Sequence, residues 1–256
     1  FDEGQRMNAI WDKARSAFSE RLTRNWSPHA LPSRATAPAV SFSFDDFPRS
    51  AAREGAQVLR EFGVKGTYFV AGARAGRHLD DVDQFTKDDV LAVAEAGHEI
   101  GCHTFGHIRL PTATHAEITD DLLRNQEFVQ QILGDYTMCS FAYPDGDVSI
   151  TSKALVGRWF PICRGIWGGV NHRRIDFMQL KAVSLERDFD LEHVERVLDE
   201  AKETNGWVIF FTHDVADKPS PYGCRPGELA GVLQAVIERG IEVLPVKNAA
   251  GKMRFP

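Results

Sequence analysis

The chain is poor in cysteine, has no long apolar run and carries no excess of positive charge. Its four cysteines form no CxxC pair and are too few for a disulfide framework in 256 residues. No stretch of about 18 apolar residues is present, so we expect no membrane span. Residues 1–26 are charged throughout and lack the apolar centre of a signal peptide. These absences favour free thiols in a reducing compartment, and therefore a cytoplasmic location.

The charge and composition exclude several kinds of partner. The net charge is −6 and both signs are spread along the chain, which argues against nucleic acid or an anionic membrane as a partner. The composition, with 43% hydrophobic and 26% charged residues, is typical of a soluble globular protein. A single α/β barrel domain often has this length and buries a large core.

The chain divides into a short N-terminal part and a main domain. Residues 5–24 predict an amphipathic helix, and residues 27–38 contain three prolines, which is typical of a linker. We therefore predict an N-terminal helix and linker over residues 1–37 and one domain over residues 38–256. The helix is expected either to pack beneath that domain or to mediate a homodimer.

Short apolar runs alternate with helical patterns along the main domain. Capping boxes predict helices that begin after Thr86 and Thr114, and Gly97, Gly134 and Gly240 follow the ends of predicted helices. Such alternation predicts a parallel sheet covered on both faces. We expect a distorted (β/α) barrel of seven to eight parallel strands, with a doubly wound open sheet as the alternative. The strand candidates are residues 39–44, 66–71, 98–102, 138–142, 160–165, 182–185, 208–212 and 241–244.

Polar residues follow three of these runs directly, where parallel sheets carry their active sites. Asp45 and Asp46 follow the first run, His103 and His107 the third, and the pair His213-Asp214 the seventh. Taken singly, paired aspartates are more often a turn or helix cap, and a histidine after a strand is more often structural. Together, two imidazoles and one carboxylate make up a typical open catalytic zinc site.

These motifs resemble those of the polysaccharide deacetylases of carbohydrate esterase family 4. The segments 43–46 (SFDD), 103–107 (HTFGH), 142–146 (AYPDG) and 211–213 (FTH) are similar to four family motifs in order and spacing. The resemblance implies that Asp46, His103 and His107 bind one divalent metal, usually Zn²⁺, with Co²⁺ or another divalent ion as a substitute. It also implies that Asp45 is the general base and His213 the general acid.

The resemblance further implies an oxyanion hole and a substrate pocket. The backbone N–H of Asp145, after Tyr143 and Pro144, would bind the oxyanion. Trp167 and Phe211 are candidates to wall an acetyl pocket or stack on a sugar, with Tyr222 as a weaker one. Aromatic residues at such positions are core residues as often.

Two expected partners of the catalytic residues are missing from their motifs. Ala142 stands where the family has an arginine that orients the catalytic aspartate, and Lys181 is our candidate to replace it. Residues 164–167 (RGIW) keep the family's tryptophan without the aspartate that tunes the acid histidine, so Asp176 or Asp214 is expected to serve.

The predicted function is therefore a metal-dependent hydrolase that removes N-acetyl groups from an N-acetylated sugar or polysaccharide and releases acetate. One alternative is a hydrolase of a non-sugar C–N amide bond, of the cyclic ureide type, on the same fold. Another is an inactive carbohydrate-binding relative, which the intact set of acid, base and metal-binding residues argues against.

Overall fold

The structure is a computed structural model that describes residues 23, 27, 30–79 and 81–254. The helix predicted over residues 5–24 lies outside the described residues except for Thr23. Its packing, the homodimer and the domain boundary at residues 37 and 38 therefore stay predictions. In the described part of the chain, no helix has the length and apolar character needed to cross a membrane. The four cysteines are free thiols.

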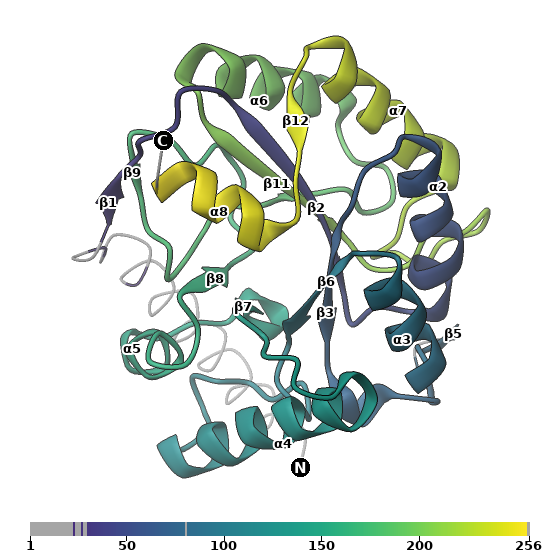
Figure 1. Cartoon of the computed structure of the whole chain (residues 1–256), viewed down its shortest axis with the longest axis vertical. Coiled ribbons are helices and arrows are strands. Elements are labelled where there is room, and N and C mark those ends of the chain that lie inside the picture. The colour runs from purple at the N-terminus through teal and green to yellow at the C-terminus, as the bar shows by residue number, and fades with distance from the viewer. Residues whose placement is uncertain (1–22, 24–26, 28–29, 80, 255–256) are drawn as a thin grey trace, which may run out of the picture.

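A parallel eight-stranded sheet forms the centre of the molecule (Figure 1). Seven strands follow in the order β10-β11-β2-β3-β6-β7-β8, and β12 pairs with β2. A bridge between Arg164 and Leu180 brings the β8 end of the sheet towards the chain entering β10, so the sheet curls into a distorted barrel as predicted. All eight predicted strands are confirmed: β2 (Ala39–Asp45), β3 (Thr67–Val70), β6 (Glu99–Cys102), β7 (Ser140–Ala142), β8 (Ile162–Arg164), β10 (Val183–Ser184), β11 (Trp207–Thr212) and β12 (Glu242–Val243).

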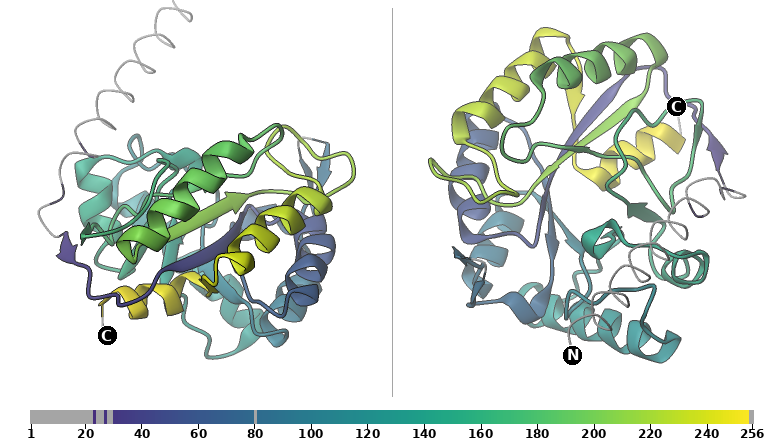
Figure 2. Two further views of the ribbon diagram at one scale, coloured as in Figure 1. Left: turned by 90° about the horizontal axis from the view of Figure 1, so that it is seen from above. Right: turned by 180° about the vertical axis from the view of Figure 1, so that it is seen from behind.

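Helices surround the curled sheet on its outer side (Figures 1 and 2). The predicted capping boxes at Thr86 and Thr114 are both present, and Gly134 ends α4 with a φ of 67°. Glycine adopts such a φ at little cost, which explains why a glycine in the sequence marks the end of this helix. The helices are α2 (Ala56–Glu61), α3 (Lys87–Glu95), α4 (His115–Leu133), α5 (Ile150–Val156), α6 (Leu191–Thr204), α7 (Pro226–Glu238) and α8 (Val246–Arg254), with shorter turns η1 (Ala51–Gly55), η2 (Gly72–Arg74) and η3 (Pro144–Gly146).

Two short antiparallel pairs lie outside the main sheet. Strand β1 (Leu31–Pro32) pairs with β9 (Arg174–Ile175), and β4 (His78–Leu79) pairs with β5 (Val82–Asp83). The sequence analysis did not predict these pairs, since two-residue strands carry no alternating hydrophobic pattern.

Strand alternation directs side chains either to the helices or into the curled sheet. In β2, Phe42 and Phe44 belong to the apolar core beneath the helices, so the intervening residues and Asp45 face the interior. In β6, Cys102 packs in the same outer core, and His103 faces inward. The alternation therefore delivers polar side chains to the interior at the carboxyl ends of several strands.

Helix α8 closes the opposite, amino end of the sheet. The N–H of Val246 donates to Thr67 Oγ1 and that of Lys247 donates to Glu99 Oε2, both at 2.9 Å. Thr67 and Glu99 are the first residues of β3 and β6, so α8 begins beneath the sheet. A buried carboxylate at a helix N-terminus satisfies free N–H groups and the helix dipole. Helix α8 therefore covers the amino ends of β3 and β6.

Gly101 in β6 provides a test of this packing. A Cβ built at Gly101 would lie 2.5 Å from a ring carbon of Phe69 and 2.7 Å from Ser140 Oγ. The Phe69 ring therefore packs against the strand at a position where only glycine fits. We expect Gly101→Ala to lower the free energy of unfolding by about 1–3 kcal/mol. The matched control is Gly231→Ala at an exposed position of α7, where nothing lies within 4 Å of an added Cβ and a gain of about 0.5–1 kcal/mol is expected. Urea denaturation measures both, and equal effects would contradict the close approach.

Candidate metal centre and catalytic cavity

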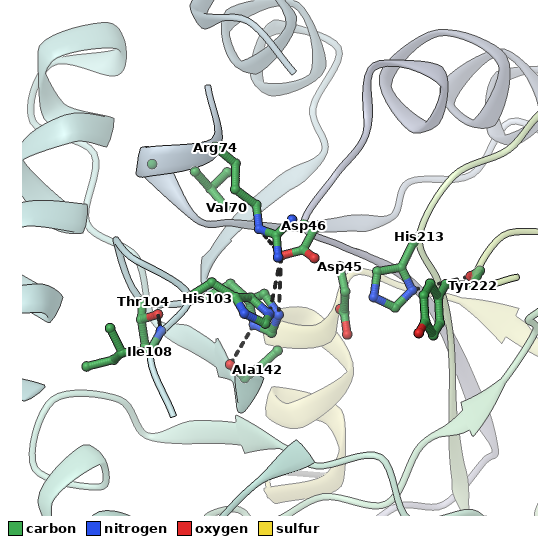
Figure 3. Close-up of polar contacts among 12 residues, drawn as sticks. Asp45, Asp46, Val70, Arg74, His103, Thr104, Ile108, Ala142, His213 and Tyr222 are labelled. Carbon is green, nitrogen blue, oxygen red and sulfur yellow. Dashed lines mark hydrogen bonds and ion pairs between the residues drawn. The ribbon is translucent and has the colours of Figure 1, made fainter. Parts of the chain in front are cut away.

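A cavity of about 350 Å³ opens at the carboxyl ends of the strands. Asp45 lies between His213 and His103 in Figure 3, and Asp46 faces His103. Residues from seven strand ends or the loops that follow them therefore meet in one space. The lining residues are Asp45, Asp46, Arg74, His103, His107, Tyr143, Asp145, Gly146, Ile166, Glu186, Phe211, His213 and Tyr222.

The two adjacent aspartates both reach this cavity because the backbone turns sharply after β2. In a continuing strand, consecutive side chains point to opposite faces. Asp46 and Phe47 instead have φ values of 55° and 50°, which end the strand and bring Asp46 to the same side as Asp45. Left-handed backbone costs roughly 1–2 kcal/mol at a non-glycine residue. Such strain often lies at functional sites.

The loop that carries the two histidines is fixed by α4 and by its own turns. Asp121 of α4 accepts the N–H of Phe105 and of Gly106, and Thr104 Oγ1 accepts the N–H of Ile108. Thr104 and His107 also adopt left-handed φ values, of 60° and 52°. This fixed loop brings His107 back towards His103, with 5.0 Å between the ring centroids.

Asp46, His103 and His107 have the geometry of a metal site. Each residue offers one ligand atom, and the three atoms lie within 4.8 Å of one another. Asp46 Oδ1 lies 3.8 Å from His103 Nε2 and 3.5 Å from His107 Nε2. Tetrahedral coordination with bonds of about 2.0–2.1 Å requires ligand atoms about 3.3 Å apart. A small contraction therefore closes the three atoms around one divalent ion.

The hydrogen bonding of this group also fits a metal. His103 Nδ1 lies 2.8 Å from the carbonyl oxygen of Ala142, so the Nδ1–H donates and the Nε2 lone pair faces Asp46. Burial lowers the pKa of His103 to about 4, which keeps the ring neutral and able to bind a cation at neutral pH. In the described part of the chain, the buried Asp46 Oδ1 has no hydrogen-bond donor. Arg74 Nε lies 3.0 Å from this oxygen and forms an ion pair with it.

Asp45 is held by Arg164, which crosses the interior from β8. The Arg164 guanidinium donates to both oxygens of Asp45, and both side chains are buried. The guanidinium carbon lies 5.2 Å from the centroid of the Phe69 ring and 4.9 Å from that of Phe211. Burial alone would raise the pKa of Asp45, but Arg164, with His103 and His213, outweighs it, so this pKa lies below the usual value. Asp45 is therefore ionised, and its carboxylate is oriented by Arg164.

This contact corrects our expectation that Lys181 replaces the missing arginine. Ala142 of β7 and Arg164 of β8 are register partners, so the guanidinium comes from the neighbouring strand at the same level. The Lys181 ammonium instead donates to the Val170 carbonyl oxygen. Arg164 is the last residue of β8 and lies one residue before the end of the run predicted over residues 160–165, so a strand-end signal applies to it as well.

Three more sequence candidates line a different cavity. Trp167, Asp176 and Lys181 lie around a space of about 340 Å³ formed by the segment 167–181. The Asp176 carboxylate accepts hydrogen bonds from Lys153 and Ser27. The expectation that Asp176 partners His213 is therefore corrected, since its charge is compensated by a buried lysine elsewhere.

The remaining predicted residues form the walls of the catalytic cavity. Tyr143 and Phe211 are buried in its wall, and Asp145 lies in the turn η3 with a φ of 56°. Pro144 is buried and begins this turn without lining the cavity. Tyr222 and Ile166 form an exposed apolar rim. Arg74 and Glu186 also line the cavity, and the sequence analysis named neither.

Comparisons with known proteins agree with this fold and site. A family model described as polysaccharide deacetylase matches residues 33–158. A chitin deacetylase of Pestalotiopsis sp is 33% identical over 94 residues, which cover 37% of this chain and 30% of that protein. A peptidoglycan-N-acetylglucosamine deacetylase of Listeria monocytogenes is 27% identical over 119 residues, which cover 46% of this chain and 24% of that protein. The matched segments thus span less than a third of either relative.

A solved structure extends the likeness of fold to most of the chain. It is a family 4 acetyl xylan esterase from Clostridium thermocellum in complex with a cobalt ion, with a TM-score of 0.61 and 20% identity, covering 85% of this chain and 93% of that one. The chain belongs to the polysaccharide deacetylase family. Its Asp46, His103 and His107 are consistent with a divalent metal site.

The Arg164–Asp45 pair predicts strong energetic coupling. Arg164→Met and Asp45→Asn each leave one buried charge uncompensated, which costs about 3–5 kcal/mol of unfolding free energy. The double variant leaves neither charge, so its cost should be well below the sum of the single costs. Urea denaturation of the four proteins at neutral pH measures this double-mutant cycle. Additive costs of the two substitutions would contradict the predicted coupling. The exposed pair Arg196–Asp190, 3.2 Å apart, is the matched control and should show little coupling.

The contribution of the Arg164–Asp45 pair to stability should also depend on pH. Because the folded-state pKa of Asp45 is lowered, its stabilisation is present above the unfolded-state pKa and is lost as the pH falls through the folded value. Without Arg164, burial is less opposed and this pKa rises. Acid unfolding of Arg164→Met should therefore begin at a higher pH than that of the unchanged protein.

Proposed function

We propose that the protein is a zinc-dependent N-deacetylase that releases acetate from an N-acetylated carbohydrate. The observation that carries the proposal is the arrangement of Asp45 between the metal-binding group and His213 in one cavity. Amide hydrolysis requires a polarised carbonyl, a base for water and an acid for the leaving nitrogen. Here the three requirements fall on three separate sets of side chains.

Asp46, His103 and His107 would hold the cation, which supplies Lewis-acid polarisation of the acyl oxygen and an acidified water. Zinc suits this set of two imidazoles and one carboxylate, although cobalt has the same ligand preference. Asp45 accepts the proton of the attacking water. Its bidentate pair with Arg164 fixes the carboxylate towards the cavity, so proton transfer needs no reorientation.

His213 donates the proton that the leaving nitrogen requires. Its Nδ1 lies 3.3 Å from the carbonyl oxygen of Tyr222 and donates to it, which leaves Nε2 facing the cavity. Across the cavity, the turn at Asp145 supplies a backbone N–H for the developing oxyanion. One such donor contributes roughly 3 kcal/mol to transition-state stabilisation.

The carbohydrate part of the proposal rests on the rim of the cavity and on the relatives. Tyr222 is 56% exposed and Ile166 is 41% exposed, so both offer apolar surface to a substrate at the cavity mouth. An exposed aromatic ring is suited to stacking on a sugar ring. The chitin and peptidoglycan deacetylases named above act on N-acetylated glycans by their names, which favours this substrate class here.

Metal content and turnover separate the roles of neighbouring residues. The purified protein should contain about one zinc or similar ion per chain by elemental analysis. His107→Ala should lose this metal, whereas Asp45→Asn should retain it and lose acetate release by about 10²–10⁴-fold. Normal turnover by Asp45→Asn would show that Asp45 is not the base. Full activity of metal-free protein would show that no metal is required.

Substrate assays separate the proposal from its alternatives. Acetate should be released from N-acetylglucosamine oligomers, measured with an enzyme-coupled acetate assay. Acetylated xylan tests for ester hydrolysis, because the similar solved structure is named an acetyl xylan esterase. A cyclic ureide provides the non-sugar arm and releases no acetate. The proposal would be overturned if the metal-loaded protein hydrolysed only the ureide, or if it hydrolysed none of these substrates.

A further inference from the structure

The loop between the two metal-binding histidines has an unfavourable backbone conformation. Thr104 and His107 adopt left-handed φ values of 60° and 52°. Residues other than glycine persist in this region only where their surroundings fix them. Phe105 and Gly106 lie between these two residues, so the position of His107 relative to His103 depends on what holds Phe105 and Gly106.

Helix α4 supplies the group that holds them. The Asp121 carboxylate accepts the N–H of Phe105, and both of its oxygens accept the N–H of Gly106, at 3.2 and 3.1 Å. Asp121 is 6% exposed, so water competes little for these hydrogen bonds. A hydrogen bond to an ionised acceptor is roughly twice as strong as one between neutral groups. One carboxylate thus fixes two consecutive N–H groups between the two ligands.

Helix α4 is itself anchored to the strand ends that carry the site. Asn125, fully buried, lies one turn after Asp121 on the same face of α4. It accepts the N–H of Gly72 at 3.0 Å and donates to the Val70 carbonyl oxygen at 2.8 Å. It also donates to Cys102 Sγ at 3.2 Å, and Cys102 and Val70 are register partners at the ends of β6 and β3. The position of Asp121 is therefore fixed relative to both strands.

Phe105 is also held on its other sides. Its carbonyl oxygen accepts the N–H of Ala73 at 2.9 Å, and the guanidinium carbon of Arg124 lies 4.3 Å from the centroid of its ring. The residue between the two ligands is thus fixed through its N–H, its carbonyl oxygen and its side chain. The contact with Asp121 extends further along the loop, to Gly106, which precedes the second ligand.

We infer that Asp121 is a positioning residue of the metal centre and sets its affinity for the cation by holding His107 in place. This inference rests on the metal of the proposed function and is independent of the substrate. A ligand atom must lie within about 0.2 Å of its ideal distance from the metal. A loop that is already fixed meets this requirement with little further loss of conformational entropy, which favours binding.

The substitution Asp121→Asn tests this role, with Asp120→Asn as the matched control. Asparagine keeps the shape of the side chain, removes its charge and offers one acceptor oxygen instead of two. Asp120 is exposed on the same helix, so its substitution removes the same charge at the neighbouring position. The measurement is the Zn²⁺ dissociation constant of the full chain, from competition with a chelator of known affinity. We expect zinc binding about 10–100-fold weaker in Asp121→Asn and unchanged in Asp120→Asn.

This measurement separates positioning from a merely structural role. A structural residue would lower the free energy of unfolding and leave the zinc affinity of the folded protein unchanged. Equal affinities of folded Asp121→Asn and the unchanged protein therefore overturn the inference. An equal loss in Asp120→Asn also overturns it, because a general effect of charge then explains the loss. If the unchanged protein binds no zinc, the metal of the proposed function is refuted and the inference with it. Zinc binding without acetate release refutes the deacetylase activity alone.

Amide hydrogen exchange, followed by nuclear magnetic resonance, gives a readout that does not require the variant to fold. In the zinc-free unchanged protein, the N–H groups of Phe105 and Gly106 should exchange slowly, because Asp121 holds them before zinc binds. Exchange of both at the rate of an unstructured loop overturns the inference. In folded Asp121→Asn, the same two groups should exchange about tenfold faster than in Asp120→Asn. Equal rates in the two variants would also contradict the role of Asp121.

Discussion

The buried pair between Arg164 and Asp45 is the interaction on which the catalytic cavity depends. It joins β8 to β2 across the interior of the curled sheet, two strands that do not pair with each other. The guanidinium also lies close to the rings of Phe69 and Phe211, which hold it in place. A buried pair of this kind contributes little net stability, but the loss of either partner is costly. Its main effect is to fix where Asp45 points.

The metal-binding group and the base obey different constraints. The three ligand atoms must converge on one point, and the chain achieves this with left-handed backbone at Asp46 and His107. Asp45 must stay close to that point without binding it. Strand alternation would separate two adjacent side chains, so the sharp turn after β2 provides both positions from consecutive residues. The local strain is therefore the geometric requirement for having ligand and base side by side.

The sequence predicted the main sheet and the residues of the cavity because both follow short-range rules. The eight strands were visible as apolar runs, and Asp45, His103 and His213 as polar residues at their ends. Arg164 and Glu186 have similar positions, since Arg164 ends the observed strand β8 and Glu186 follows the strand predicted over residues 182–185. They were missed because their places in the interior depend on the register of β7 with β8 and of β10 with β11. The prediction of Lys181 for the role of Arg164 was wrong, because the position of a residue near a motif does not determine which side of the sheet its side chain reaches.

The position of Arg164 follows from the physics of a curled sheet. A metal ligand is restricted to within a few tenths of an ångström, so its position along the chain is fixed by the local backbone. A compensating charge acts through space over several ångströms, and a long side chain such as arginine extends its reach further. The interior is one shared volume, and inward positions on adjacent strands at the same level give access to the same point. A guanidinium on β8 beside Ala142 can thus orient Asp45. The electrostatic partners of a catalytic group are therefore less tied to a sequence motif than its metal ligands are.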